Sequence, residues 1–198
     1  MTPPLTLNCE ADLLKTRGAQ DWATKAGLEK ARWKGLVWNL SFFDKTSSLA
    51  EIVNEDDLSQ KRYYIVDIDG DVTPCVYGAD VVEALVQKAG LKLTKDNVSD
   101  YLSFYLGFTR GQAGRVLVIQ NVDDLILREE LTLITRRNLQ ALITPFHVQS
   151  ETKVEGCFLI TDKLFKALAS IDAHGSVMLQ PLEILADTLP VQDQALSA

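Results

Sequence analysis

The pattern of apolar and polar positions is most regular in the middle of the chain. Residues 79–89 and 95–106 both place apolar side chains at the i, i+3, i+4 and i+7 spacing of one helix face. The first face consists of Val82, Leu85, Val86 and Ala89, and the second of Val98, Tyr101, Leu102, Tyr105 and Leu106. Gly90 is a stop signal for the first helix, and Thr94 is a cap for the second. We predict an amphipathic helix over each range.

Apolar runs separated by turn-like positions replace the helical spacing beyond Leu131. These runs are about eight to ten residues long and cover 139–148, 154–161, 164–171 and 177–184. His174-Gly175 is the sharpest turn between them. Four successive strands without helices between them predict an antiparallel meander. A preceding strand is expected over 115–120, with Asn121 as the cap of a short helical turn.

The beginning of the chain has mainly helical signals. We predict a short helix over 9–17, capped by Asn8, and a second helix over 20–34 that ends at Gly35. The apolar and aromatic run at 36–43 then predicts a strand.

A capping box and a polar stretch follow that strand. Ser48 and Glu51 have the S-x-x-E spacing of a capping box, so a short helix is expected to begin there. The polar stretch Asn54–Gln60 is the best candidate boundary in the chain. We therefore expect one globular domain over 1–198, in which a helical subdomain, 1–58, is distinguishable from a sheet-containing part, 59–198.

Composition and charge limit the classes of function. The chain has 198 residues, of which 46% are hydrophobic and 24% charged, a mixture typical of a globular protein. Its net charge of -7 opposes non-specific attraction to nucleic acid or to anionic lipid. No apolar run approaches the ~20 residues that cross a membrane, and no secretory signal opens the sequence. Three scattered cysteines, Cys9, Cys75 and Cys157, indicate free thiols in a reducing, cytoplasmic compartment.

These patterns together predict an α+β fold. Its order is N-terminal helices, one β-hairpin, two helices, and a C-terminal antiparallel β-meander that forms a curved sheet. A meander that curves around helices resembles nuclear-transport-factor-like and cystatin-like folds, in which a pocket opens inside the sheet. This resemblance concerns the fold and does not by itself give a function.

The segment Tyr63–Thr73 has two interpretations. In the first, 62–68 and 71–77 are strands of a hairpin, joined by a type I′ turn at Asp69-Gly70. The acidic residues beside such a turn are solvated. The segment is then a structural element without chemistry.

In the second interpretation, an apolar strand ends in the sequence DIDGD, with Asp67, Asp69 and Asp71 as its acidic residues. This resembles the DxDGT motif of haloacid-dehalogenase-type phosphohydrolases, although Asp71 stands where that family has threonine. The resemblance implies that Asp67 attacks phosphorus, that Asp69 is the general acid/base, and that Mg²⁺ binds to their carboxylates.

Two further positions are candidates for binding. His147 stands in an apolar strand, where it is either a general base at a pocket or a structural histidine. Gly111–Gly114, between Arg110 and Arg115, is either an anion-binding turn or a turn that leads into a strand.

Because no other catalytic or metal-ligating group of residues is recognisable, we expect a non-catalytic protein without a cofactor. We expect it to bind a small apolar ligand or a protein partner. The sequence does not decide whether the chain forms a homo-oligomer. The alternative is a Mg²⁺-dependent phosphohydrolase that uses Asp67 and Asp69.

Overall fold

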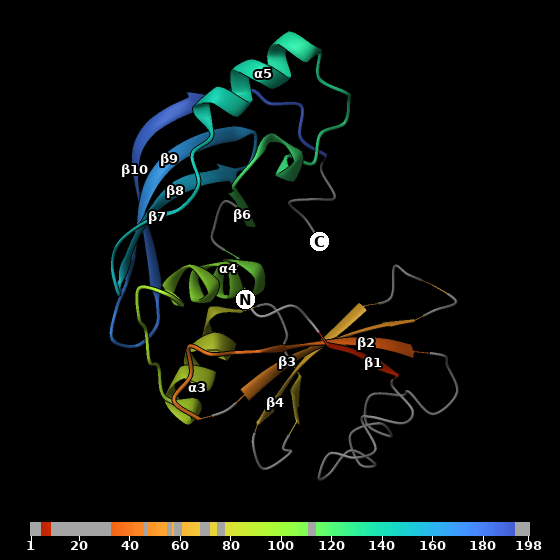
Figure 1. Cartoon of the computed structure of the whole chain (residues 1–198), viewed down its shortest axis with the longest axis vertical. Coiled ribbons are helices and arrows are strands. Elements are labelled where there is room, and N and C mark those ends of the chain that lie inside the picture. Colours follow the sequence, from red (N-terminus) through yellow and green to blue (C-terminus); the bar gives the residue numbers. More distant parts are fainter. Residues whose placement is uncertain are drawn as a thin grey trace. The chain divides into compact units, whose positions relative to one another are not determined.

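The computed structural model describes residues 5–8, 33–45, 47–54, 57, 61–67, 72–74, 78–110 and 114–192 (Figure 1). The chain divides into an N-terminal unit, residues 1–76 and 87–92, and a C-terminal unit, residues 77–86 and 93–198. Each unit contains an antiparallel sheet, and helices are also present, so the α+β class is confirmed. None of the helices in the described ranges is long and apolar enough to cross a membrane.

The sheet of the N-terminal unit has five strands in the order of the sequence. They are β1 (Leu5–Asn8), β2 (Trp33–Asn39), β3 (Ser47–Asn54), β4 (Lys61–Asp67) and β5 (Val72–Pro74). Every neighbouring pair is antiparallel. Leu40, Phe42 and Ile52 are fully buried in this unit. The loop after β2 is fixed to residues 89–92 by backbone hydrogen bonds, among them Lys92 N to Phe42 O at 2.9 Å.

The capping-box prediction is wrong, because Ser48 and Glu51 lie within β3 and begin no helix. β3 is a central strand, and its neighbours β2 and β4 satisfy its backbone groups on both edges. The stretch Asn54–Gln60 connects β3 to β4, and Val53 pairs with Lys61 across it. It therefore joins two neighbouring strands of one sheet.

Of the two helices predicted at the beginning of the chain, the structure tests only the end of the second one, at residues 33 and 34. β2 begins at Trp33, so the predicted helix over 20–34 does not reach residue 34. The range 9–17 and the rest of 20–34 lie outside the described residues. The strand predicted over 36–43 is confirmed for 36–39, within β2.

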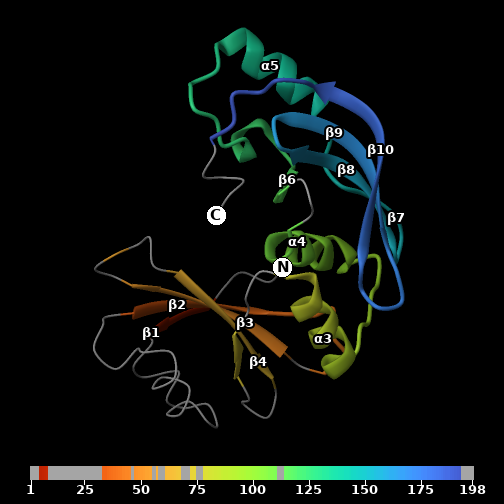
Figure 2. The same cartoon turned by 180° about the vertical axis from the view of Figure 1, so that it is seen from behind.

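The C-terminal unit contains the remaining elements. These are α3 (Ala79–Ala89), whose last turn belongs to the N-terminal unit, α4 (Val98–Phe108), β6 (Val116–Ile119), the 3₁₀ turn η2 (Val122–Asp124), α5 (Leu133–Leu142), β7 (His147–Ser150), β8 (Lys153–Ile160), β9 (Lys163–Ile171) and β10 (Val177–Ala186). The strand order is β10-β9-β8-β6, and β7 pairs with the same strand, β8, as β6 does. Figures 1 and 2 show that β8, β9 and β10 curve along their length.

Most predictions for the C-terminal unit are confirmed. The helix over 79–89 has the predicted bounds and buried face, and Gly90 after it has a φ of +74°. The second helix begins at Val98, later than the cap predicted at Thr94, and all five residues of its predicted face are buried. The predicted meander is present as β7 to β10, with Gly175 at a φ of +84° in its last turn.

The strand predicted over 139–148 is wrong. Residues 133–142 form α5, and only 147–148 of the predicted range are strand, in β7. Thr132 caps this helix, since its Oγ1 accepts a hydrogen bond from Thr135 N at 3.2 Å. The Thr132 cap, the buried Leu139 and the absence of internal glycine and proline together favour a helix here.

Candidate functional site

Asp67 and Asp69 are only partly placed by the structure. Asp67 is the last residue of β4, and Asp69 lies outside the described residues. β4 pairs antiparallel with β5, which confirms a hairpin. Val66 pairs with Val72, whereas a two-residue turn at Asp69-Gly70 would pair Val66 with Thr73. The register of the hairpin therefore differs by one residue from that of the predicted type I′ turn, whose own residues are not described.

His147 lies at the start of β7 and is exposed. Its cross-strand neighbour is Glu155, which accepts hydrogen bonds from Lys166 Nζ at 2.8 Å and Gln149 Nε2 at 3.1 Å. The hydrogen bond from Lys166 lowers the pKa of the Glu155 carboxyl group. Glu155 and its neighbours form a polar group on the surface of the sheet. His147 is not among the residues that line the pocket between η2 and α5.

The glycine-rich turn is described only at its end, where Gly114 has a φ of +95°. Residues 111–113 lie outside the described part of the chain, so its role as an anion site stays a prediction. Of the cysteines, Cys157 is a buried free thiol, and Cys9 and Cys75 lie outside the described residues. No group of three or more metal-ligating side chains occurs in the described ranges.

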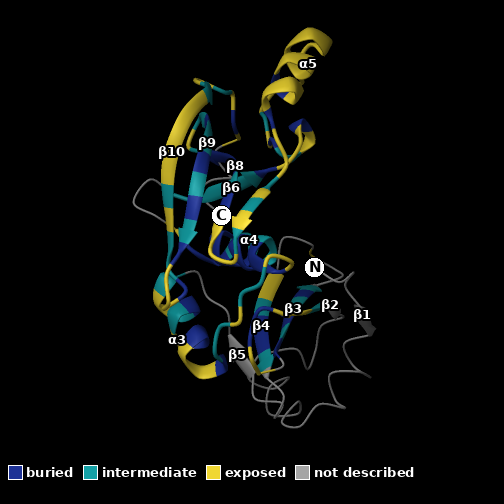
Figure 3. Cartoon of the chain, turned by 60° about the vertical axis from the view of Figure 1, so that its left-hand side comes forward, coloured by how far each residue is buried: buried dark blue, intermediate teal, exposed yellow. Residues whose placement is uncertain are grey.

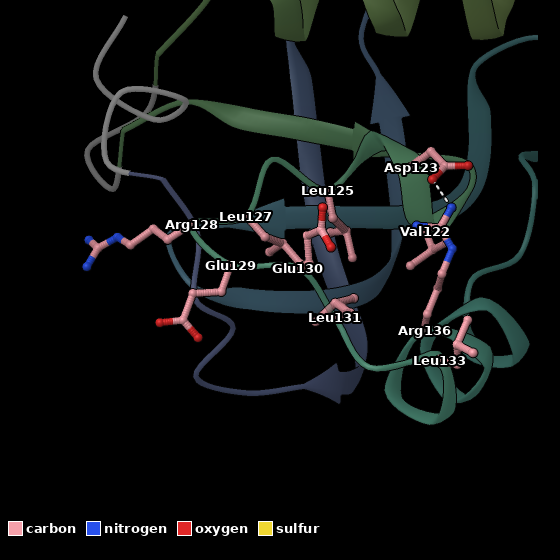
Figure 4. A pocket seen from close by; sticks show the side chains of 10 residues that line it. All are labelled: Val122, Asp123, Leu125, Leu127, Arg128, Glu129, Glu130, Leu131, Leu133 and Arg136. Carbon is pink, nitrogen blue, oxygen red and sulfur yellow. Dashed lines mark hydrogen bonds and ion pairs between the residues drawn. The ribbon is translucent and has the colours of Figure 1, made fainter.

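A pocket that the sequence analysis did not predict lies between η2 and the first turn of α5. Its volume is about 590 Å³, within the range of small-molecule sites. The residues that line it are Val122, Asp123, Leu125, Leu127, Arg128, Glu129, Glu130, Leu131, Leu133 and Arg136 (Figure 4). We call it the leucine pocket, because four of the five apolar residues are leucines.

The wall of the leucine pocket near η2 is fixed by a capping box. Asn121 Oδ1 accepts a hydrogen bond from Asp123 N at 2.8 Å, and Asp124 Oδ2 accepts one from Asn121 N at 2.9 Å. Val122 N donates to Gln140 Oε1 at 3.0 Å, which ties η2 to α5. The sequence analysis predicted the cap at Asn121, and this prediction is confirmed.

The floor of the pocket is fixed by pairing with a distant segment. Arg128 N donates to Pro190 O at 2.8 Å, and Gln192 N donates to Ile126 O at 3.0 Å. Val122 and Leu125 of the lining belong to a buried cluster, whose members are Ile119, Val122, Leu125, Leu139, Ile143, Cys157, Leu159, Leu164 and Val191. Leu127 and Leu131 pack against this cluster and are partly exposed. The leucines of the pocket are therefore supported from below by the buried cluster.

Charged side chains surround the apolar floor. Arg136 forms an ion pair with Asp123, which Figure 4 shows on the η2 side of the pocket. In the same view, Arg128 and Glu129 point away from the leucines. Half of the lining residues are charged, and the polar part of the lining surface is larger than the apolar part. The pocket therefore offers apolar contact at its floor and polar contact elsewhere, which suits a ligand with an apolar part and a polar part.

One signal in the sequence is consistent with the pocket. Leu125, Leu127, Leu131 and Leu133 all stand at odd positions. Sequence reasoning missed the pocket because this spacing belongs to no regular element, and because pairing with residues 190–192 decides how the segment runs. Comparisons of the chain with protein-family models, curated proteins and solved structures gave no match.

Proposed function

We propose that this protein is a non-catalytic binding protein whose ligand is a small molecule with an apolar body. The leucine pocket carries this proposal, since it is an open hollow of about 590 Å³ in which Val122 and Leu125 belong to a buried cluster and Leu127 and Leu131 pack against that cluster. Apolar surface that a folded protein keeps in a supported concave site is typical of ligand binding.

The proposal also includes the compartment, the excluded partners and the fold of the C-terminal unit. We place the protein in the cytoplasm, with neither nucleic acid nor membrane as a partner, because of its negative charge and its cysteine usage. The curved sheet and the helices beside it support a likeness of the C-terminal unit to nuclear-transport-factor-like or cystatin-like folds. That likeness remains a proposal about fold.

The dye 8-anilinonaphthalene-1-sulfonate, which has an apolar body, is a suitable probe. We expect fluorescence titration to give one site in each chain. Leu131→Gln should weaken binding by at least about tenfold, because the full burial of one leucine contributes roughly 1.5–3 kcal/mol and each 1.4 kcal/mol is about tenfold. Leu182→Gln is the matched control, since Leu182 is an exposed leucine of β10 outside the pocket. Unchanged binding in Leu131→Gln, or equal loss in the control, would contradict the proposal.

A second variant covers the case in which Leu131→Gln does not fold. Leu133 lines the pocket but is 76% exposed, so Leu133→Gln removes an apolar wall at little cost in stability. We expect weaker dye binding here as well, with an unchanged midpoint of urea unfolding. Native mass spectrometry of freshly purified protein then reports whether a ligand is retained.

The alternative function, Mg²⁺-dependent phosphoester hydrolysis, has one supporting observation: Asp67 stands at the carboxyl end of an apolar strand. The neighbours of that strand are antiparallel, unlike the alternating strand and helix units of that family. We expect no Mg²⁺-dependent hydrolysis of p-nitrophenyl phosphate above background. Turnover that disappears in Asp67→Asn would replace the binding proposal with the alternative.

A further inference from the structure

The charged side chains that line the leucine pocket differ in the direction in which they point. The lining contains three carboxylates and two guanidinium groups, so its excess charge is negative, like that of the whole chain. In Figure 4, Arg128 and Glu129 point away from the leucines, whereas the carboxylate of Glu130 points toward Leu125. Glu130 therefore presents its negative charge to the apolar part of the pocket.

The remaining two charged residues of the lining already pair with each other. Asp123 and Arg136 form an ion pair on the η2 side of the pocket. An anionic ligand could bind Arg136 only by replacing Asp123, and the released carboxylate would then stand close to that anion. The ligand would gain one attraction and meet one repulsion of similar size. The Arg136 guanidinium group is therefore a poor anchor for an anion.

Glu130 has no such partner within the described part of the chain. Its carboxylate forms no hydrogen bond or ion pair with the described residues, and the residue is exposed to water. Water hydrates this carboxylate while the pocket is empty of ligand. A ligand that lies on the leucines displaces part of that water, and removing water from a carboxylate without a compensating partner is unfavourable. A ligand avoids this cost when it brings a positive charge to Glu130.

We propose that the ligand of the leucine pocket is an amphiphilic organic amine. Its apolar body lies on the leucines, and its protonated amino group pairs with the Glu130 carboxylate. This inference rests on the proposed function and adds the chemical class of the ligand. Discrimination comes from both sides: an amine gains an ion pair, whereas a neutral ligand of the same shape leaves Glu130 unpaired and an anionic one is repelled.

Three compounds with the same octyl chain and different head groups test this class. Octylamine is a cation at neutral pH, octanol is neutral and octanoate is an anion. Isothermal titration calorimetry measures the dissociation constant of each compound directly. We expect octylamine to bind about fivefold more tightly than octanol, as expected for one ion pair near the surface, and octanoate to bind most weakly. Any order in which octylamine is not the tightest binder would overturn the proposal.

The central variant removes the charge of Glu130 and keeps the size of its side chain. Glu130→Gln should weaken octylamine about fivefold and leave octanol nearly unchanged. Glu129→Gln is the matched control, because Glu129 lines the same pocket and points away from the leucines. Both residues are exposed, so the midpoint of urea unfolding should stay the same in both variants. Equal weakening of octylamine in the two variants would contradict the role of Glu130.

Charge reversal at the same position gives a gain as well as a loss. In Glu130→Lys the head-group order should reverse, so octanoate binds more tightly than octylamine. A gain of affinity for octanoate requires a folded pocket, so it cannot come from damage to the structure. An unchanged preference for octylamine in Glu130→Lys would overturn the pairing with Glu130.

This inference and the proposed function can fail separately. Leu131→Gln should weaken all three octyl compounds to a similar degree, because it changes the apolar floor and not the charge. The dye 8-anilinonaphthalene-1-sulfonate carries an anionic head group, so Glu130→Gln should bind it at least as tightly as the unchanged chain does. Binding that depends on Leu131 but not on the head group would keep the proposed function and overturn this inference. Absence of binding by the dye and by all three compounds would overturn both.

Discussion

The helices α4 and α5 belong to the same unit but are stabilised by different interactions. Seven residues of α4 are buried, whereas Leu139 is the buried residue of α5 (Figure 3). α4 packs against β6 and β8, and Phe104 and Phe108 lie with their ring centroids 5.2 Å apart. α5 depends on its Thr132 cap and on polar contacts to η2. Core packing therefore fixes α4, and capping with one buried leucine fixes α5.

The difference explains why one helix is a structural element and the other a candidate surface. The hydroxyl group of Tyr101 donates a hydrogen bond of 2.5 Å to Gly175 O, which joins α4 to the turn between β9 and β10. α5 instead leaves Leu133 and Ile134 exposed. Apolar residues that a helix does not use for its own packing remain available for binding.

The largest effect is expected in the core of α4. Leu102 is fully buried, so Leu102→Ala should lower the free energy of unfolding by about 2–4 kcal/mol, through lost apolar contact and a residual cavity. Urea unfolding measures this loss. A loss below roughly 0.5 kcal/mol is typical of surface sites. It would show that α4, like α5, is not held by core packing.

A second effect concerns the turn that α4 contacts. Gly175 has a φ of +84°, and an added Cβ would meet the Tyr101 hydroxyl group and, at 2.8 Å, Val86 Cγ2. Gly175→Ala should cost about 1–3 kcal/mol. Gly107→Ala in α4 is the control, because a Cβ there meets no atom within 4 Å and alanine favours a helix. Equal unfolding midpoints for the two variants would contradict this prediction.

A third effect depends on pH. Burial, and then the charges of Tyr105, Asp172 and Glu83, raise the pKa of the Tyr101 hydroxyl group well above its usual range. Stability from this group is complete below the unfolded pKa of about 10. As pH rises above it, the unfolded tyrosine ionises first, so the free energy of unfolding should fall by about 1.4 kcal/mol for each pH unit. Tyr101→Phe should reduce that slope; identical slopes would show that Tyr101 is not the responsible group.

The smallest effect is expected in α5. Leu133→Ala should change the free energy of unfolding by less than about 0.5 kcal/mol, because Leu133 is 76% exposed and alanine favours a helix. A loss comparable to that of Leu102→Ala would mean that α5 packs against the body of the unit after all.

The sequence by itself determined the elements whose pattern extends over several turns or strands. α3, α4 and the strands β8, β9 and β10 follow from apolar periodicity, bounded by Gly90 and by the turn at Gly175. Each of these signals repeats over eight or more residues, so many weak local preferences add up. The buried face of α4 was predictable residue by residue for the same reason.

The tertiary structure decided the elements whose local signals are short. Ser48 and Glu51 carry a helical cap, but β3 is a strand because β2 and β4 pair with it on both edges. Residues 139–142 have apolar residues that suit a strand, yet they end α5, which Thr132 caps ten residues upstream of Leu142. The leucine pocket depends on hydrogen bonds between residues about 60 positions apart, such as Arg128 and Pro190. A cap contributes about 1 kcal/mol, whereas a paired strand satisfies a backbone group at nearly every residue, so long-range pairing decides where local signals are brief.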